Sequence, residues 1–284
     1  FLLGRIHGIG ASDARIRGRG VLWGEHLAAM DARGNRTGLL VFFDRASDRV
    51  TVEGITMIAS PHYNLLIRGS GAVVRNVKMM GWWFGNDGIG TGRDSLIEDC
   101  FLRVNDDAFK LYHSNTTVRR CVIWQMENGA AFQFTWNMTS DNSGFRVSDC
   151  DVIRVDHHHD ANNRGIFTAI HGGSGNMSDY LFDDVRIENA TFRLVLLTAL
   201  KTSWARSPYS GNITDVTFRD ISADGPFSQT SVIGSYESTG RFEGITFENL
   251  RIGGRWIHSA EEGAFEIDPA STADIRFIVT RQEP

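Results

Sequence analysis

Three aspartates lie in two short acidic segments that could together perform acid and base chemistry. Asp87 belongs to Asn86-Asp87-Gly88, and Asp106 and Asp107 belong to Asn105-Asp106-Asp107, with a step of nineteen positions from Asp87 to Asp106. Neighbouring carboxylates repel one another, so one of them is expected to hold a proton at neutral pH. A protonated acid beside an ionised carboxylate is what the hydrolysis of a glycosidic bond requires. The pattern therefore predicts a carbohydrate-cleaving site.

The elements that carry these acids form an internal repeat. In each copy a polar residue precedes an apolar anchor, and an alternating strand follows. The anchors are Ile55, Val77, Cys100, Cys121, Cys150, Val185, Ile221 and Leu250, spaced by 22, 23, 21, 29, 35, 36 and 29 positions. About 22 residues per coil in the regular part predicts an all-β, right-handed parallel β-helix, with coils stacked at about 4.8 Å. A β-sandwich is the alternative, but it does not account for eight copies of one phrase.

The repeat places the acids on neighbouring coils. Asp87 lies 13 residues before Cys100, and Asp107 lies 14 residues before Cys121. We therefore expect the carboxylates within several ångströms of one another, on one exposed strand edge. For any single Asp the alternative is a turn-capping role, which is common for Asp and Asn.

Composition limits the other function classes. The 284 residues include 30 Gly, 18 Phe and 5 Pro, which suits one elongated β domain over residues 1–284. A net charge of -5 leaves no basic footprint for nucleic acid, and no apolar run reaches the roughly 20 residues of a membrane span. The three cysteines favour stacked buried thiols, with a Cys100–Cys121 bridge as the alternative. No signal peptide is recognised in the given chain, although we expect a secreted or periplasmic protein.

Several irregular segments are expected around the regular coils. The clearest early strand pair covers residues 14–22, and an excursion with one helical turn is expected over residues 26–38. Insertions at residues 156–163 and 203–211 should loop out on one face, and a last strand is expected at residues 273–279.

These motifs resemble the clan of inverting polysaccharidases that contains family 28 glycoside hydrolases, the polygalacturonases, and family 49, the dextranases and isopullulanases. The step from Asp87 to Asp106, the segment 121–129 and Gln133-Phe134-Thr135-Trp136 are more similar to family 49. Family 28 needs a Gly-His-Gly motif and an Arg-x-Lys motif, whereas this chain has Asn128-Gly129-Ala130 and Arg164-Gly165-Ile166. Family 49 enzymes resemble two-domain proteins, and their N-terminal β-sandwich is not expected in this chain.

The resemblance implies roles for the acids. Asp106 would be the general acid, while Asp87 and Asp107 would act as general base and water-positioning carboxylate. An inverting mechanism calls for an acid and a base roughly 6.5–9.5 Å apart. The implied activity is the cleavage of α-glucosidic linkages in a polysaccharide such as dextran.

Further residues are candidates for contacting the sugar. Tryptophan faces can stack on sugar rings, with core packing as the alternative, and Lys110 could bind hydroxyls or steady an ionised aspartate. The candidates for substrate binding are Trp82, Trp83, Asn86, Lys110, Tyr112, Asn128, Gln133, Trp136 and His171. We expect no metal and no cofactor, because consecutive residues such as His157, His158 and His159 rarely converge on one ion.

The expected partner is a polysaccharide or oligosaccharide, bound by a monomer. An acidic cleft disfavours a polyanionic substrate, which ranks α-glucan above pectin. Two alternatives remain at this point: a polygalacturonase-like pectin hydrolase and a non-catalytic, polysaccharide-binding β-helix.

Overall fold

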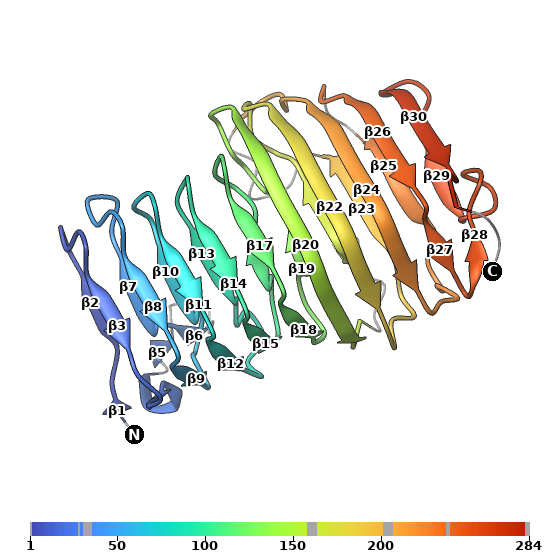
Figure 1. The fold of residues 1–284 in the computed structure, drawn as a ribbon. Helices are drawn as coiled ribbons and strands as arrows, with labels where there is room; N and C mark the ends of the chain where they lie inside the picture. Colours follow the sequence, from blue (N-terminus) through green and yellow to red (C-terminus); the bar gives the residue numbers. More distant parts are fainter. Residues whose placement is uncertain are drawn as a thin grey trace.

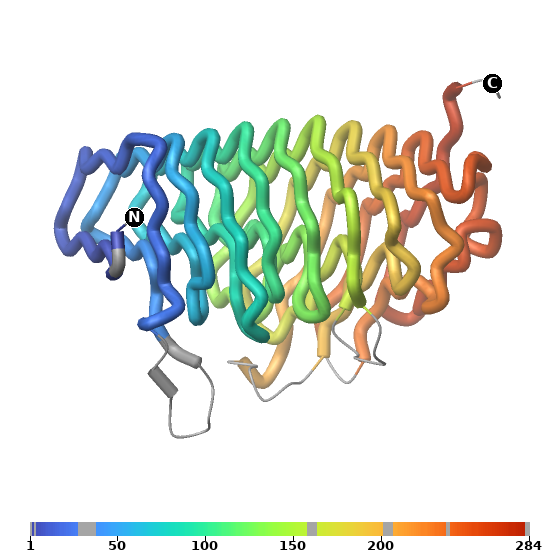
Figure 2. The backbone as a smooth tube through the Cα atoms, turned by 90° about the horizontal axis from the view of Figure 1, so that it is seen from below, coloured from blue at the N-terminus to red at the C-terminus, as the bar shows by residue number. Residues whose placement is uncertain are grey.

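The chain winds into a stack of coils along one axis in the computed structural model, which describes residues 2–27, 29–30, 36–157, 164–200, 207–236 and 239–281. Figure 1 shows the strands side by side in sequence order, and Figure 2 shows the coils progressing from the N-terminus to the C-terminus. Two large sheets, of 18 and 10 strands, run along the stack. The predicted all-β parallel β-helix is therefore confirmed.

The smaller of the two large sheets takes one strand from each coil, and its neighbours pair in parallel. Its strands are β2 (Ile6–Gly8), β7 (Val41–Phe43), β10 (Leu65–Ile67), β13 (Ile89–Thr91), β16 (Phe109–Lys110), β19 (Ala130–Gln133), β21 (Gly165–Ile170), β23 (Val195–Ala199), β25 (Ser231–Ser235) and β29 (Phe265–Ile267).

The larger sheet takes the remaining two strand positions of each coil, which merge into single long strands in the later coils. Its strands are β1 (Leu2–Leu3), β3 (Arg15–Arg17), β4 (Val21–Trp23), β8 (Thr51–Glu53), β9 (Thr56–Ile58), β11 (Val73–Arg75), β12 (Lys78–Met80), β14 (Leu96–Glu98), β15 (Phe101–Val104), β17 (Thr117–Arg119), β18 (Val122–Gln125), β20 (Asn142–Val155), β22 (Met177–Ile187), β24 (Ile213–Ala223), β26 (Phe242–Glu248), β27 (Arg251–Ile252), β28 (Arg255–Trp256) and β30 (Thr272–Ile278).

The polar residue of the repeated phrase occupies a corner where the backbone turns into the left-handed region. Asn76, Asp99 and Asp149 have φ angles of 50°, 57° and 50°. Asn, Asp and Gly tolerate this conformation better than other residues, because short polar side chains bond locally and Gly has no Cβ. The corner then sends the next residue, the apolar anchor, inward. This explains why the repeat reads as Asp or Asn followed by an apolar residue.

The anchors form part of one continuous core. All eight are buried, from Ile55 to Leu250. In the later coils phenylalanines stack from one coil to the next, with ring centroids 5.3 Å apart for Phe182 and Phe218 and 4.9 Å apart for Phe218 and Phe247. Like residues on successive coils therefore build the interior, as in other solenoids.

The three cysteines belong to this ladder. Cys100, Cys121 and Cys150 are buried and free. Contact with the other two thiols, followed by burial, raises the pKa of Cys121. The expected stack of buried thiols is confirmed, and the alternative Cys100–Cys121 bridge is not formed.

The irregular segments agree in part with the expectations drawn from the sequence. Strands β3 and β4 cover the expected early pair, and β30 covers the expected last strand. The turn near residue 26 is the short 3-10 helix η1 (Glu25–Leu27), and β5 (Ala29–Met30) pairs antiparallel with β6 (Arg36–Thr37). Part of these segments lies outside the described residues, namely residues 28 and 31–35 of the expected excursion and residues 158–163 and 203–206 of the expected insertions. None of the described helices is long and apolar enough to cross a membrane.

Candidate active site

The acidic residues lie in the turns that lead from the larger sheet into the smaller one. The turn after β12 carries Asp87 into β13, and the turn after β15 carries Asp106 and Asp107 into β16. The amide of Gly88 donates to the carbonyl of Asp107 at 2.9 Å, and Ile89 pairs with Phe109. Asp87 and Asp107 therefore occupy the same position on adjacent coils, as the repeat predicts.

The three carboxylates converge on one point. One oxygen from each of Asp87, Asp106 and Asp107 lies within 4.8 Å of the others. The expected exposed edge is wrong for two of them, since Asp87 is 4% exposed and Asp107 is 2% exposed. Asp106 is half-buried and is the acid that reaches the surface. The physical reason is that a lysine enters the cluster and makes burial of two carboxylates tolerable.

That lysine is Lys110, whose ammonium lies between the two buried acids. Its Nζ is 2.7 Å from Asp87 Oδ1 and 2.6 Å from Asp107 Oδ2. The rings of Tyr63 and Tyr112 lie 5.1 and 5.5 Å from the same nitrogen. Burial opposes the charge of Lys110, but the two carboxylates outweigh it and raise the pKa of the ammonium. The three acids could also attract a cation, but Lys110 already neutralises part of their charge.

Asp106 is oriented by two donors. The amide of Asp107 donates to its Oδ1 at 2.9 Å, and the side-chain amide of Asn128 donates to its Oδ2 at 2.9 Å. Burial and the charge of Asp107 raise the pKa of Asp106 to about 7, while Lys110 and the two donors oppose that rise. A carboxyl with this pKa can hold a proton near neutral pH and release it, which is what a general acid needs.

Asp87 and Asp107 differ in their donors. Burial raises the pKa of Asp87 well above its usual value, and the charges of Asp106 and Asp107 add to that rise while Lys110 opposes it. Asp107 accepts hydrogen bonds from Lys110 at 2.6 Å and from the amide of Ala130 at 3.2 Å. Of these two buried acids, Asp107 has the fuller set of donors to an ionised carboxylate.

A second layer of amides fixes the turn that carries Asn128. The side chain of Gln125 donates to the carbonyls of Asp106 and Asn128, and the amide of Asn128 donates to Asn105 Oδ1 at 3.1 Å. Gly129 follows with φ 71°, and a Cβ there would lie 2.4 Å from the amide nitrogen of Asp107. This glycine allows the next coil to approach the acids closely.

The aromatic residues predicted to contact the substrate differ in how deeply they are buried. Trp82 is 38% exposed, while Trp83, Tyr112 and Trp136 are half-buried. Among these four rings, Trp82 is the most exposed and therefore the most accessible to substrate. Contact of these rings with substrate stays a prediction.

Three other predicted contacts are internal in this structure. Asn86 donates to the carbonyls of Ser60 and His62, and Gln133 donates to the carbonyl of Thr135. His171 lies between Thr135 Oγ1, at 3.2 Å, and the carbonyl of Gly175, at 2.7 Å. All three are buried. The structure does not bring them to the surface beside the acids, and it gives each an internal structural role.

Tyr63 is the residue of the cluster that sequence reasoning missed. Leu65 pairs with Ile89, so Tyr63 occupies one coil earlier the position that Asp87 and Asp107 occupy later. The repeat therefore contained a signal for it. Of the histidine run, His157 is buried, and His158 and His159 lie outside the described residues.

The chain is similar in sequence to known dextranases and an isopullulanase. No family model matches the chain. The chain is 30% identical over 145 residues to a dextranase of Arthrobacter sp. (strain CB-8), a match that covers 44% of this chain and 23% of that protein. It is 28% identical over 178 residues to an isopullulanase of Aspergillus niger, covering 56% of this chain and 31% of that protein. This chain is homologous to family 49 dextranases and isopullulanases.

The solved structures show the same fold. Dex49A from Penicillium minioluteum superposes with a TM-score of 0.76 and 19% identity, over 98% of this chain and 52% of that one. The exopolygalacturonase of Thermotoga maritima superposes with a TM-score of 0.63 and 14% identity, over 85% of this chain and 54% of that one. The resemblance to family 49 is thus confirmed by the sequence matches, and the solved structures share the β-helix fold. The matches cover less than a third of the length of these two family 49 homologues.

Proposed function

We propose that this protein is a glycoside hydrolase that cleaves α-glucosidic linkages of a neutral polysaccharide such as dextran. The observation that carries the proposal is the convergence of Asp87, Asp106 and Asp107 within 4.8 Å. Homology to dextranases and isopullulanase supports the substrate class. Because such a polymer is too large to enter a cell, we place the protein outside the cytoplasm.

In the proposed reaction Asp106 gives its proton to the glycosidic oxygen as the bond between that oxygen and the anomeric carbon breaks. A water molecule attacks the anomeric carbon from the other face, and an ionised carboxylate accepts the proton of that water. We infer that Asp107 is the ionised base, since Lys110 and Ala130 both donate to it. Asp87 then helps to position the water through the same ammonium.

The spacing of the acids differs from the expectation for inversion. Carboxyl groups of inverting enzymes are roughly 6.5–9.5 Å apart, and those of retaining enzymes roughly 5–5.5 Å. The nearest oxygens here lie within 4.8 Å. We still propose inversion, because the Lys110 ammonium is bound to both buried carboxylates and makes each a poor nucleophile. Proton NMR of the first product settles the point: inversion of an α-linkage releases the β-anomer, and release of the α-anomer contradicts it.

The activity test measures reducing-sugar release from dextran, pullulan and polygalacturonate by the wild type and by Asp106→Asn. We expect release from an α-glucan, lowered by at least about 100-fold in the variant, because proton donation contributes roughly that much. Release should also fall as the pH rises through about 7, since Asp106 loses its proton there.

The control is Asp94→Asn, which changes an exposed carboxylate on the same coils but outside the cluster. It should keep the wild-type rate. Release from polygalacturonate alone would replace the α-glucan proposal with a pectin hydrolase. Equal release by the wild type and Asp106→Asn would remove Asp106 as the acid.

A further inference from the structure

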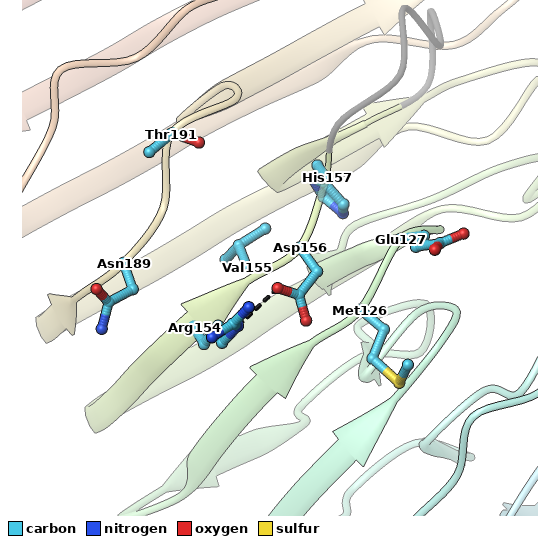
Figure 3. A pocket seen from close by; sticks show the side chains of 8 residues that line it. All are labelled: Met126, Glu127, Arg154, Val155, Asp156, His157, Asn189 and Thr191. Carbon is cyan, nitrogen blue, oxygen red and sulfur yellow. Dashed lines mark hydrogen bonds and ion pairs between the residues drawn. The ribbon is translucent and has the colours of Figure 1, made fainter.

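A shallow hollow lies on the outer surface of the larger sheet, away from the acids. Its volume is about 440 Å³, and its lining residues come from β20, β22, β24, β26 and β30, which Figure 1 shows side by side. From Arg146 in the hollow, β20 runs nine residues to Val155 at the edge that carries the acids, a path of roughly 30 Å along the strand. Another hollow, among the turns after β18, β20 and β22, lies beside the acids (Figure 3).

One row of side chains forms the floor of the remote hollow and runs parallel to the stack. The strand register places one residue of each coil in this row: Arg146, Leu181, Thr217, Thr246 and Arg276. Four steps of about 4.8 Å make the row roughly 19 Å long. Arginines stand at both ends, and the three shorter side chains lie between them. A floor that repeats from coil to coil suits a ligand that also repeats, such as a linear polymer.

A gap opens beside this row at Gly244. Asp179, Asp215 and Asp274 occupy the same corner on the neighbouring coils, with φ angles of 57°, 55° and 52°. Gly244 has the same conformation, with φ 67°, and a Cβ there would lie 3.2 Å from Asp215 Oδ1. The glycine therefore leaves out one side chain from a row of carboxylates, and a ligand can reach the floor from that side.

Charged side chains around the floor are held in place before any ligand arrives. Arg146 Nη2 donates to Asp179 Oδ2 at 2.8 Å. Arg219 donates from Nε and Nη2 to the two oxygens of Asp183, at 2.9 and 2.7 Å. Because these side chains are already ordered, less conformational entropy is lost when a ligand binds to them.

The floor itself offers hydroxyl groups that the protein does not use. Thr217 and Thr246 are half-buried, and neither hydroxyl has a hydrogen-bond partner within the described part of the chain. Each hydroxyl can both donate and accept. The methyl groups of these threonines and the side chain of Leu181 supply apolar contact for the C–H face of a sugar.

The charges of the lining balance one another. The lining carries three guanidiniums and three carboxylates, those of Arg146, Arg219, Arg276, Asp179, Asp215 and Glu248. A polyanion or a polycation would therefore meet like charges as well as opposite ones. A sugar hydroxyl can accept from a guanidinium and donate to a carboxylate, so it can use both kinds of group. The lining thus favours a neutral, polyhydroxylated ligand.

We propose that this hollow is a second carbohydrate-binding site, which holds a neutral glucan chain without taking part in its cleavage. The choice of glucan rests on the proposed function. A polymer bound at the hollow stays attached to the protein between cuts, which raises the effective concentration of its other segments at the acids. The site therefore affects the cleavage of long polymers and leaves the cleavage of short oligosaccharides unchanged.

The test measures binding by the retardation of Asp106→Asn in native gels that contain dextran, since this variant should leave the polymer uncut. Thr217→Val with Thr246→Val removes both floor hydroxyls and keeps β-branched side chains. Gly244→Asn closes the gap with a residue that tolerates the left-handed conformation. We expect each change to raise the Kd for dextran about fivefold, as the loss of two modest hydrogen bonds predicts.

The matched control is Thr51→Val, at a half-buried threonine of β8 in the same row on an earlier coil, outside the hollow. It should leave the retardation unchanged. Thermal unfolding of every variant separates a loss of binding from a loss of folding. In the active protein, the hollow variants should raise KM for dextran and keep kcat/KM for isomaltotriose.

Two results separate this site from the proposed function. If the wild type cleaves dextran and the hollow variants are retarded as strongly as Thr51→Val, the second site is overturned and the function stands. If retardation depends on the hollow but the wild type releases no sugar from dextran, pullulan or polygalacturonate, the site stands and the hydrolase is overturned. An absence of retardation in every variant also overturns the site.

Discussion

At the scale of single residues, Lys110 links the two buried carboxylates of the cluster. Its Nζ contacts Asp87 and Asp107 at 2.7 and 2.6 Å but makes no such contact with Asp106 in the described structure. A nearby cation favours the ionised form of a carboxylate, so Lys110 opposes the effect of burial on these acids. Burial raises the pKa of both Asp87 and Asp106, that of Asp106 to about 7, and the charge of Lys110 opposes both rises.

We therefore predict that Lys110→Met lowers kcat by about 100-fold or more and moves the pH optimum upward. Removal of the positive charge takes away a group that lowers the pKa of Asp87 and of Asp106, so both acids keep their protons to a higher pH. The measurement is a profile of kcat/KM against pH. Lys78→Met, at an exposed lysine of β12, is the matched control. A lowered kcat with an unmoved profile would show that Lys110 serves only to hold the fold.

At the scale of elements, the turn after β18 supports the acids of the preceding coil. Gly129 in this turn has φ 71°, and a Cβ there would lie 2.5 Å from the carbonyl carbon of Asp106 and 2.6 Å from its Oδ1. Real Cβ atoms do not approach backbone this closely, so one of the two coils must move. The acids depend on this approach, because Asn128 and Ala130 on either side donate to Asp106 and Asp107.

Gly129→Ala should lower kcat at least tenfold and destabilise the protein by about 1–3 kcal/mol, because displaced catalytic groups lose their alignment. Activity assays and denaturant unfolding measure the two effects. Gly10→Ala is the control, since Gly10 has φ 60° with nothing within 4 Å of an added Cβ. It should show the backbone cost of about 1 kcal/mol without a loss of activity. Equal activity of the two variants would mean that the turn does not position the acids.

Some of these elements could be predicted from the sequence, and others could not. The coils and the pairing of Asp87 with Asp107 were predictable, because left-handed corners favour Asn, Asp or Gly, which precede every anchor except Cys121. The contact between Trp124 and Arg154 was not predictable. A register shift between Ile123 and Trp124 pairs Trp124 with Arg154, and a shift of one residue changes which side chains share a face. The burial of Asp87 was also hidden, since it depends on Lys110 entering from the next coil.

At the scale of the whole molecule, stability comes from contacts between neighbouring coils. Phe182, Phe218, Phe247 and Phe277 stack in sequence, with centroids 5.3, 4.9 and 4.8 Å apart. In a solenoid each coil contacts chiefly the coils on either side, so the loss of a contact destabilises those neighbouring coils first. The cluster of acids lies several coils before Phe218, on turns that have their own packing in the same core.

Phe218→Ala should therefore destabilise the protein by about 3–5 kcal/mol, the usual range for a buried Phe, with the loss concentrated around β22, β24 and β26. Denaturant unfolding gives the total, and amide hydrogen exchange gives its distribution along the chain. Tyr209→Ala, at an exposed ring, should change stability by less than about 0.5 kcal/mol. If protection falls equally in β22 and in the distant β10, all the coils unfold as one cooperative unit, and the loss is not confined to the coils next to Phe218. Protection that falls only near Phe218 would show that the coils carrying the three acids keep their structure when the C-terminal coils open.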